Sequence, residues 1–437
     1  MKKVELLAPA KNIKSIKAGI NYADAFYFGA KKFNMRMQTD NFNEVDLSRG
    51  VKICHNNNGK KAYFVSNILV YENELEELER SLEAAKSLEF DAVIVNDLST
   101  VELCREMKIP FHISTQQNIS NSKAARFFEE LGAQRIILAR ECSLEQIKEI
   151  SGRLTKTEIE VFVHGAMCTM VSGRCYLSLD VCNGENSANR GRCVQPCRRE
   201  WTVTDNVSNE YIYDGVRFLN SRDMCMIEYI PEMIDAKIAS FKIEGRMREP
   251  HYVDVVTRCY REAIDAHYDG TFSGKKVKRW IFELKKVYNR GFTHGFYLNR
   301  VTEEDHQHKS PTNLSHWRLI KMGTITHYSR KNRDGKMARV KLTNGSLKRG
   351  QEVIIIGNSR SDTYFHQKIR HIELNSGKVI NTTRNATRQK PINVWINVEE
   401  PVRPERVDSV CIFTDRTYKN RMDDASKKKR KADYYKL

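Results

Sequence analysis

Eight short runs of β-branched and aromatic residues alternate with helix-like stretches over the first 250 residues, and this alternation constrains the fold most. Continuous apolar runs of this length are typical of parallel strands that helices cover on the outside. Eight of them, spaced about 20 to 40 residues apart, predict an α/β fold with a (β/α)8 TIM-like barrel rather than an open sheet. The runs are residues 4–8, 24–29, 62–67, 92–96, 111–114, 135–139, 158–163 and 239–244.

One interval is far longer than the others, because 75 residues separate the seventh run from the eighth. We therefore expect a barrel domain over 1–270 with a Cys-rich insertion at 165–236, before the last strand. In such barrels the loops that follow the strands form the active face. The insertion and several polar residues would meet there, although individual ones could equally cap helices or lie on the rim: Asn67, Asn96, Asp97, Gln116, Gln117, Arg140, Glu141, His164, Lys242, Glu244 and Arg246.

The last third of the chain has a different texture. Residues 271–317 read as a basic helical linker, and 318–414 contain short Gly-bounded strands that predict a small β-barrel. Within it LKRGQEVI (347–354) resembles a signature of the β-barrels of translation factors. A basic tail follows at 415–437.

The positive charge is concentrated in this last third. Residues 1–274 have 36 Lys and Arg against 39 Asp and Glu, a net charge of −3, whereas 275–437 have 37 against 16, a net charge of +21. Such a segment beside a near-neutral one favours a surface that binds a polyanion such as nucleic acid, with a solvated tail as the alternative. No apolar run is long enough to cross a bilayer, so we expect a cytoplasmic protein without membrane contact.

Five of the eleven cysteines lie within residues 165–198, with Cys225 a little downstream. A cytosolic location disfavours disulfides. The spacing C-x6-C-x6-C-x10-C-x3-C lacks the two tight knuckles of most zinc sites, and iron–sulfur clusters tolerate more varied spacing. Zinc, an iron–sulfur cluster and reduced or redox-active thiols all remain open. A catalytic cysteine beside His164 is a further alternative.

Several motifs together resemble peptidase family U32, the collagenase-like peptidases, over residues 3–300. They are ELLAPA (5–10), DAFYFG (24–29), EVFVHGAMC (160–168), SGRC (172–175), ANRGRCVQPCR (188–198) and SFKIEGR (240–246). The ending, RGFTHGFY (290–297) followed by the expected β-barrel, resembles the branch of this family that makes 5-hydroxyuridine in tRNA.

The resemblance implies a four-iron four-sulfur cluster and prephenate as co-substrate. Its metal ligands would be four among Cys168, Cys175, Cys193, Cys197 and Cys225, while Cys182 has no counterpart in the pattern. The main hypothesis is therefore an iron–sulfur enzyme that forms 5-hydroxyuridine at the wobble uridine, with the tRNA anticodon stem-loop as its partner. The resemblance also leaves room for a partner protein of the same family.

We assign catalytic roles to His164, Lys242 and Glu244, with His164 or Glu244 moving protons. Substrate binding falls to Arg36, Gln116, Arg140 and Arg246, because guanidinium groups pair well with the two carboxylates of prephenate. Aromatic residues of the basic segment would stack on unpaired bases or else form the core of the small barrel: Phe292, Phe296, Tyr297 and Trp317. Two alternatives stay open, a cysteine- or metal-dependent collagenase-like peptidase and a non-catalytic tRNA-binding protein with structural zinc.

Overall fold

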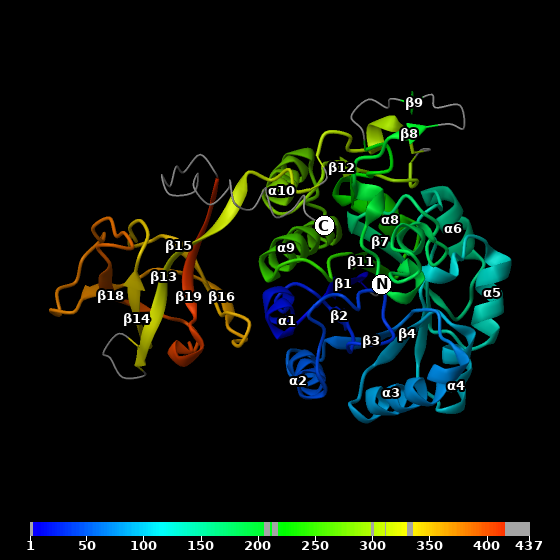
Figure 1. The fold of residues 1–437 in the computed structure, drawn as a ribbon, viewed down its shortest axis with the longest axis horizontal. Helices are drawn as coiled ribbons and strands as arrows, with labels where there is room; N and C mark the ends of the chain where they lie inside the picture. Colours follow the sequence, from blue (N-terminus) through cyan, green and yellow to red (C-terminus); the bar gives the residue numbers. More distant parts are fainter. Residues whose placement is uncertain are drawn as a thin grey trace. The chain divides into compact units, whose positions relative to one another are not determined.

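The computed structural model describes residues 3–204, 210–211, 217–298, 301–310, 312–329 and 335–415. The chain divides into two compact units, Met1–Leu314 and Ser315–Leu437. Figure 1 labels the helices and strands of both units. The expected basic tail lies outside the described residues from position 416 onward.

The first unit is a closed parallel barrel. Its eight strands follow the order β1 to β7 and then β11, and β11 pairs in parallel with both β1 and β7 to close the ring. All eight predicted runs are strands of this barrel, so the predicted fold class is confirmed. The strands are β1 (Glu5–Pro9), β2 (Ala25–Phe28), β3 (Lys61–Ser66), β4 (Ala92–Val95), β5 (Phe111–Ile113), β6 (Arg135–Ile137), β7 (Glu158–Ala166) and β11 (Ser240–Ile243).

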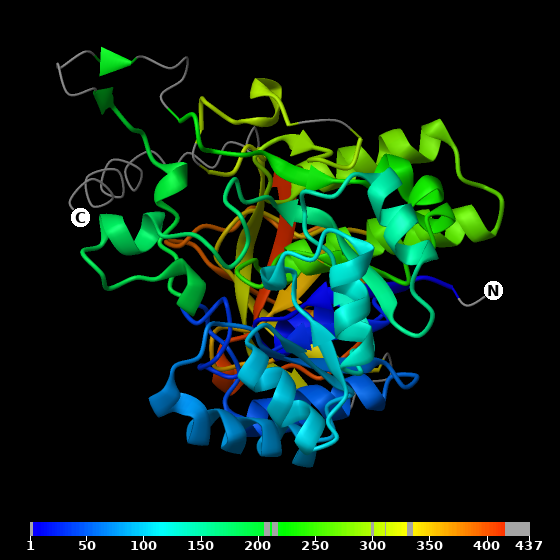
Figure 2. The ribbon, with the colours of Figure 1, turned by 90° about the vertical axis from the view of Figure 1, so that its right-hand side faces the viewer.

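Helices surround the barrel (Figure 1, Figure 2). Local capping sets where several begin: Asn43 caps α2, Asp97 caps α4 and Ser143 caps α6 with side-chain oxygens that accept backbone N–H groups. Asp97 is thus one strand-end residue with the simpler role of a helix cap. The helices are α1 (Ile13–Gly19), α2 (Glu44–His55), α3 (Leu75–Ser87), α4 (Leu98–Glu106), α5 (Ser122–Glu130), α6 (Leu144–Gly152), α8 (Ile230–Asp235) and α9 (Pro250–Tyr268).

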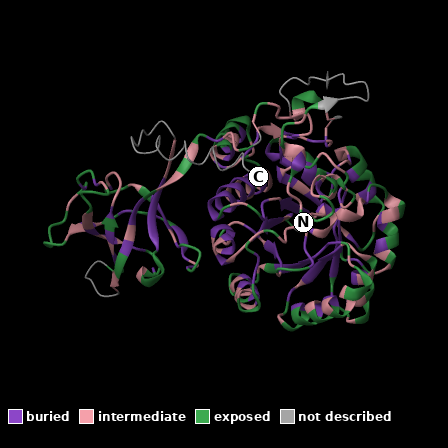
Figure 3. Cartoon of the chain, in the orientation of Figure 1, coloured by how far each residue is buried: buried purple, intermediate pink, exposed green. Residues whose placement is uncertain are grey.

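Burial follows this layering, with buried residues in the strands and exposed ones on the outer faces of helices such as α3 and α5 (Figure 3). In the described part of the chain, none of the helices combines the length and the apolar composition needed to cross a membrane.

The Cys-rich insertion lies between β7 and β11. It contains the short helix α7 (Leu177–Val181), a two-stranded ribbon of β8 (Val203–Thr204) and β9 (Glu210–Tyr211), and strand β10 (Asp223–Cys225). Strand β10 runs antiparallel to the end of β7 and places Cys225 opposite His164. A side chain at Gly173 would have its Cβ 2.7 Å from the carbonyl oxygen of Gln116, so only glycine lets the insertion approach the barrel here.

Residues 271–317, expected as a linker, belong instead to the first unit as far as Leu314. Helix α10 (Gly274–Lys286) contacts α9 and buries Trp280, and β12 (Phe292–Thr293) pairs with β10. The basic residues of α10 gave the segment its linker-like composition, but its apolar stripe packs against the barrel.

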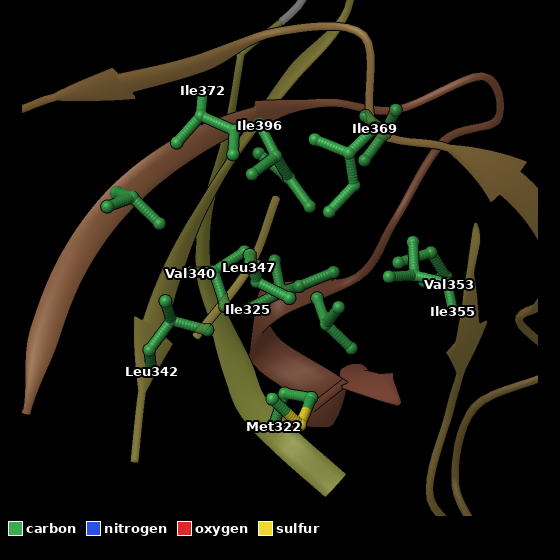
Figure 4. Close-up of a cluster of buried hydrophobic side chains, with 14 of the residues drawn as sticks. Met322, Ile325, Val340, Leu342, Leu347, Val353, Ile355, Ile369, Ile372 and Ile396 are labelled. Atoms are coloured by element: carbon green, nitrogen blue, oxygen red, sulfur yellow. The ribbon is translucent and has the colours of Figure 1, made fainter. Parts of the chain in front are cut away.

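The second unit, expected as a small β-barrel, is a seven-stranded antiparallel sheet that curves into a half-barrel. Its order is β16-β15-β19-β13-β14-β18-β17, and among the described residues the edge strands β16 and β17 do not pair. Figure 4 shows its aliphatic core, which includes Val340, Ile355 and Ile396. The strands are β13 (Trp317–Ser329), β14 (Met337–Leu342), β15 (Glu352–Ile356), β16 (Tyr364–Lys368), β17 (Ile372–Leu374), β18 (Ile392–Asn397) and β19 (Ser409–Asp415).

Candidate functional site

A cavity of about 200 Å³ lies at the carboxyl ends of the barrel strands. Its floor and walls come from strand residues such as Tyr27 of β2, Ile94 of β4 and Lys242 of β11, and the insertion covers it with residues 165–198. The face predicted to be active therefore contains a cavity whose cover is the Cys-rich segment. Of the predicted site residues, the following line it: Arg36, Gln116, Arg140, His164, Cys168, Cys175, Cys193, Cys197, Lys242, Glu244 and Arg246.

Four thiols face this cavity, those of Cys168, Cys175, Cys193 and Cys197. Cys225 does not line it. Its buried sulfur lies 3.9 Å from the Tyr260 hydroxyl, on the barrel side of β10. Cys225 therefore lies apart from the four thiols of the cavity in this structure, and its role as a ligand stays a prediction.

In the positions described, the four thiols are spaced too widely to bind a single tetrahedral zinc ion together. Zn–S bonds of about 2.3 Å in a tetrahedron bring sulfurs to within about 4 Å of each other. No three of these four sulfurs, all of which belong to described residues, lie within 4.8 Å of one another. A donor set of four cysteines at wider spacing is the chemistry of an iron–sulfur cluster.

Backbone geometry holds the Cys-rich loop in place. The backbone N–H of Cys175 donates to the Asn189 side chain at 2.9 Å. At Gly191, where φ is +77°, a Cβ would lie 2.1 Å from the carbonyl oxygen of Asn34. Only a glycine at position 191 therefore lets the loop between Cys175 and Cys193 pack this closely against the barrel.

Arg140, which is buried, and Arg198, which is half-buried, bind the loop that carries Cys168. Arg140 donates to the carbonyl oxygens of Cys168 at 3.4 Å and Met170 at 3.2 Å, and to the Ser172 hydroxyl at 2.6 Å. Arg198 donates to the carbonyl oxygen of Met167 at 2.6 Å. Both arginines thus position the loop by satisfying its backbone oxygens.

The same arginines tune the Cys168 thiol. Burial acts to raise the pKa of Cys168, but the positive charge of Arg140, a backbone hydrogen bond and the charge of Arg198 outweigh it and lower the pKa below the usual value. By contrast, burial raises the pKa of Cys197 to about 11 and also raises that of Cys193. Among these three thiols, that of the exposed Cys168 is therefore the most easily deprotonated.

Three polar atoms in the cavity wall have no hydrogen-bond partner among the described residues. They are Nε of Arg140, Nε of Arg246 and Oε1 of Gln116, all of them buried. Arg246 otherwise donates to the side chains of Asn34 and Asn41, and burial lowers its pKa to about 10. Buried unpaired groups are costly, so these atoms are the natural contacts for a polar ligand.

Glu244 and Arg36 form an ion pair at the cavity wall, with Nη2 of Arg36 3.0 Å from Oε1 of Glu244. Burial acts to raise the pKa of Glu244, but the charge and hydrogen bonds of Arg36 lower it overall. Glu244 is thus held as a carboxylate. A carboxylate with a lowered pKa is a poor proton donor near neutral pH, and the proton-shuttling role proposed for Glu244 from the sequence stays a prediction.

Lys242 projects from the middle of β11 and donates to the fully buried Glu160 at 2.7 Å. Glu160 also pairs with Arg135 at 3.1 Å, and Arg135 with Glu5 at 2.6 Å. A chain of alternating charges therefore runs through the barrel interior below the cavity. Lys242 is at its upper end, where it lines the cavity.

His164 is buried in the cavity wall, with Nδ1 3.4 Å from the Tyr260 hydroxyl. Its ring packs against those of Tyr260 and Phe292 at 5.5 and 5.7 Å between centroids. Burial lowers the pKa of His164 to about 4, so the imidazole is neutral near pH 7. No hydrogen bond joins His164 to Cys168, both of which are described.

Sequence reasoning missed two arginines that line the cavity, the half-buried Arg198 and the buried Arg290. Arg198 adjoins Cys197 in the motif at 188–198, which is a signal that could have pointed to it. Arg290 pairs with the buried Asp223 of β10, with 2.9 Å between Nε and Oδ1. No local pattern links Arg290 to the cavity, because the contact depends on β12 packing beside β10.

The aromatic residues proposed to stack on bases have mostly structural roles. The Tyr297 hydroxyl donates to the carbonyl oxygen of Phe162 at 2.6 Å, Phe292 packs on His164, and Trp317 packs on Phe413 at 5.4 Å. Phe296 lines a second, smaller cavity of about 80 Å³ that also touches Cys168.

Comparison with known proteins adds a family and several relatives. The model of the family described as peptidase family U32 matches residues 11–307. An uncharacterized protease of Methanocaldococcus jannaschii is 42% identical over 365 residues, which cover 82% of this chain and 87% of the relative.

Two further relatives have more informative names. A collagenase of Porphyromonas gingivalis is 34% identical over 92% of this chain and 96% of its own length. The tRNA hydroxylation protein P1 of Bacillus subtilis is 34% identical over 82% of this chain and 84% of its own length.

Proposed function

The chain belongs to peptidase family U32, and from that premise we propose that it is a tRNA-modifying enzyme that forms 5-hydroxyuridine at the wobble position of the anticodon, in a prephenate-dependent reaction. The observation that carries the proposal is the set of four thiols on one cavity at the carboxyl ends of the barrel strands. A relative named as a tRNA hydroxylation protein supports the choice of substrate.

In this proposal Cys168, Cys175, Cys193 and Cys197 hold a four-iron four-sulfur cluster. When bound, such a cluster supplies a Lewis-acid or electron-transfer centre. Arg140 and Arg198 place two positive charges beside the loop of thiolates and stabilise their negative charge. Their hydrogen bonds to the loop backbone also fix where Cys168 lies.

The unpaired atoms of the cavity wall support binding of an anionic co-substrate. Arg140 and Arg246 each keep one buried N–H without a partner among described residues, and Gln116 keeps its side-chain oxygen. A carboxylate would satisfy the two N–H donors, and a hydroxyl or an N–H group of the ligand would satisfy the oxygen of Gln116. Prephenate, with two carboxylates and a hydroxyl, has these groups.

His164 is the proposed proton acceptor of the site. Its imidazole is neutral near pH 7 and lines the cavity beside the Tyr260 hydroxyl. Glu244 stays ionised next to Arg36 and orients that guanidinium instead. Lys242, fixed by Glu160, places a positive charge at the cavity floor, where it would attract the anionic co-substrate.

The rim of the cavity suits an unpaired base that is turned out of the loop. Val171 and Met247 line the cavity and remain 48% and 42% exposed, and Tyr176, next to Cys175, is 69% exposed. Exposed apolar and aromatic side chains offer stacking surfaces for splayed bases. The wobble uridine of an anticodon loop would reach the cavity over these residues.

Charge supports RNA as the partner. The second unit, residues 315–437, has 28 Lys and Arg against 12 Asp and Glu, a net charge of +16, whereas 1–314 have 45 against 43, a net charge of +2. A cationic unit gains affinity for phosphates through counterion release.

A collagenase-like peptidase is the second candidate, because one relative is named collagenase and the pKa of Cys168 is lowered. A cysteine peptidase requires a base within hydrogen-bond reach of its thiol. His164 makes no hydrogen bond to Cys168, which favours the hydroxylase. Gelatin cleavage by the purified protein that is lost in Cys168→Ala would favour the peptidase.

The test of the proposed function is the nucleoside content of tRNA from a deletion strain. We expect 5-hydroxyuridine and its derivatives to disappear, to return with the intact gene and to stay absent with Cys168→Ala. Cys225→Ala is the matched control, since this thiol does not face the cavity, and it should restore the modification. Unchanged 5-hydroxyuridine in the deletion strain would refute the proposal.

A further inference from the structure

The half-barrel of the second unit carries a row of aromatic and basic residues on its outer face. None of these residues lines the cavity described above. His327 of β13 is the register partner of Arg339 of β14, and Arg339 is the partner of Trp395 of β18. The next residue of β14 on the same face is Lys341, which is the register partner of Asn393. We call His327, Arg339, Lys341 and Trp395 the Trp395 patch.

Strand alternation puts these side chains on the face opposite the core. Val340 and Ile396 point into the aliphatic core, as Figure 4 shows, so their neighbours Arg339 and Trp395 point outward. His327 and Lys341 are exposed, and Arg339 and Trp395 are half-buried. The indole of Trp395 lies edge-on to the imidazole of His327, with 6.0 Å between ring centroids.

The cations of the patch have no acidic partner. Among the described residues neither the guanidinium of Arg339 nor the ammonium of Lys341 forms an ion pair. Glu373, the residue of β17 opposite Trp395, is already bonded to His371 at 3.2 Å. The loop from 375 to 391 leads into β18 and contains further exposed basic residues: Lys378, Arg384, Arg388 and Lys390.

We propose that the Trp395 patch binds a single-stranded segment of RNA, with a base stacked on Trp395 and phosphates on Arg339 and Lys341. Sheets that bind unpaired RNA combine outward aromatic rings with basic side chains in this way. A protein partner fits less well, since the centres of protein interfaces are depleted of lysine. The inference rests on the proposed function only in taking RNA as the partner.

Binding of a fluorescently labelled, single-stranded oligouridine to the full-length protein tests the patch, with fluorescence anisotropy as the readout. Loss of one stacked base weakens binding roughly 5- to 100-fold, which is the expected effect of Trp395→Ala. Trp395→Phe keeps a ring to stack on and should stay within about threefold of the wild type. Lys123→Ala, an exposed lysine on α5 of the first unit, is the matched control and should leave affinity unchanged.

The salt dependence of binding gives a second, independent measurement, because Lys341 is exposed and its replacement spares the fold. Lys341→Ala should weaken binding and reduce the slope of log affinity against log salt by about 0.7, the value for one contact with a single-stranded phosphate. An unchanged slope in Lys341→Ala would contradict the phosphate contact.

The outcomes separate the patch from the proposed function. If the wild type binds the oligonucleotide and folded Trp395→Ala binds equally well, the patch is refuted and the proposed function stands. If 5-hydroxyuridine persists in the deletion strain but Trp395→Ala still loses RNA affinity, the proposed function fails and the patch stands. If the wild-type protein binds no RNA even at low salt, the proposal that the patch binds RNA is also refuted.

Discussion

The cations of the barrel cavity and those of the half-barrel sheet differ in what they touch. In the cavity, Arg198 is bonded to loop carbonyls, Arg290 to Asp223 and Lys242 to Glu160. On the sheet, Arg339 and Lys341 have no acidic partner among described residues. Arg290 and Lys242 are buried and Arg198 is half-buried, whereas the second set lies on an outward face.

This contrast has a physical origin. A charge removed from water needs a partner to offset its desolvation, so a buried cation is bound to the protein that surrounds it. An exposed cation keeps its water and can exchange it for an external phosphate. Arg198 and Arg290 therefore build the site, whereas the sheet cations remain available to a partner.

The largest expected effect concerns the thiols of the cavity. Cys168→Ala should lower iron content and reduce 5-hydroxyuridine formation roughly 100-fold or more, because removal even of the groups that support metal ligands costs 10- to 100-fold. Cys225→Ala should leave both unchanged. Iron analysis and absorption spectra of anaerobically prepared proteins check this. Equal iron loss in the two variants would return Cys225 to the ligand set.

A buried pair in the cavity wall should dominate stability. Arg290→Met leaves Asp223 buried without its cation, and breaking such a pair costs about 3–5 kcal/mol of unfolding free energy. Urea unfolding followed by circular dichroism measures the change. A loss below about 1 kcal/mol would show that the buried pair contributes no more than an exposed ion pair, which would contradict the contrast drawn above.

Acid should destabilise the first unit through His164. The unfolded imidazole has a pKa of about 6.5, whereas burial lowers the folded pKa to about 4. Above pH 6.5 both states are neutral. Between pH 6.5 and 4 only the unfolded state takes up the proton, so stability falls with acid by about 3 kcal/mol in all.

Urea unfolding of the wild type and of His164→Gln at pH 7.5 and 4.5 measures the contribution of His164 to the pH dependence of the unfolding free energy. We expect the variant to lose less stability between the two pH values. His316→Gln, at an exposed histidine, should behave like the wild type. Glu244, whose folded pKa is lowered, stabilises the fold above its unfolded pKa of about 4.3 and loses that contribution only as the pH falls below it.

The smallest effect should come from an exposed ion pair of the sheet unit. Arg370 and Glu399 lie 3.1 Å apart with side chains 76% and 43% exposed. Arg370→Ala should change the unfolding free energy by less than about 1 kcal/mol, because water already screens the pair. Thermal unfolding checks it. A cost as large as that of Arg290→Met would remove the distinction between the two sets of cations.

Much of the barrel and of its site was predictable from local signals. The eight apolar runs predicted the strands correctly, because a parallel strand that is buried on both faces is apolar throughout. The position of the insertion after the seventh run placed its cysteines at the active face. The seven residues proposed to act on or bind substrate all line the cavity, from Arg36 to Arg246.

Other features depend on contacts between distant parts of the chain. Composition marked residues 271–317 as a linker, but Trp280 is buried and Arg290 reaches the cavity. Arg290 pairs with Asp223, 67 positions earlier, and no periodicity records such a contact. Likewise the aromatic residue that faces outward, Trp395, is not among those proposed from the basic segment, since facing depends on sheet register.

The amino-acid sequence by itself determined the barrel, the thiol-rich cover of its carboxyl face and the excess of positive charge near the end, since periodicity and composition are local properties. Only the tertiary structure decided which four thiols share a cavity, which arginines are already bonded and to which face of its sheet Trp395 belongs. These outcomes depend on strand pairing and burial, which bring together residues far apart in the chain.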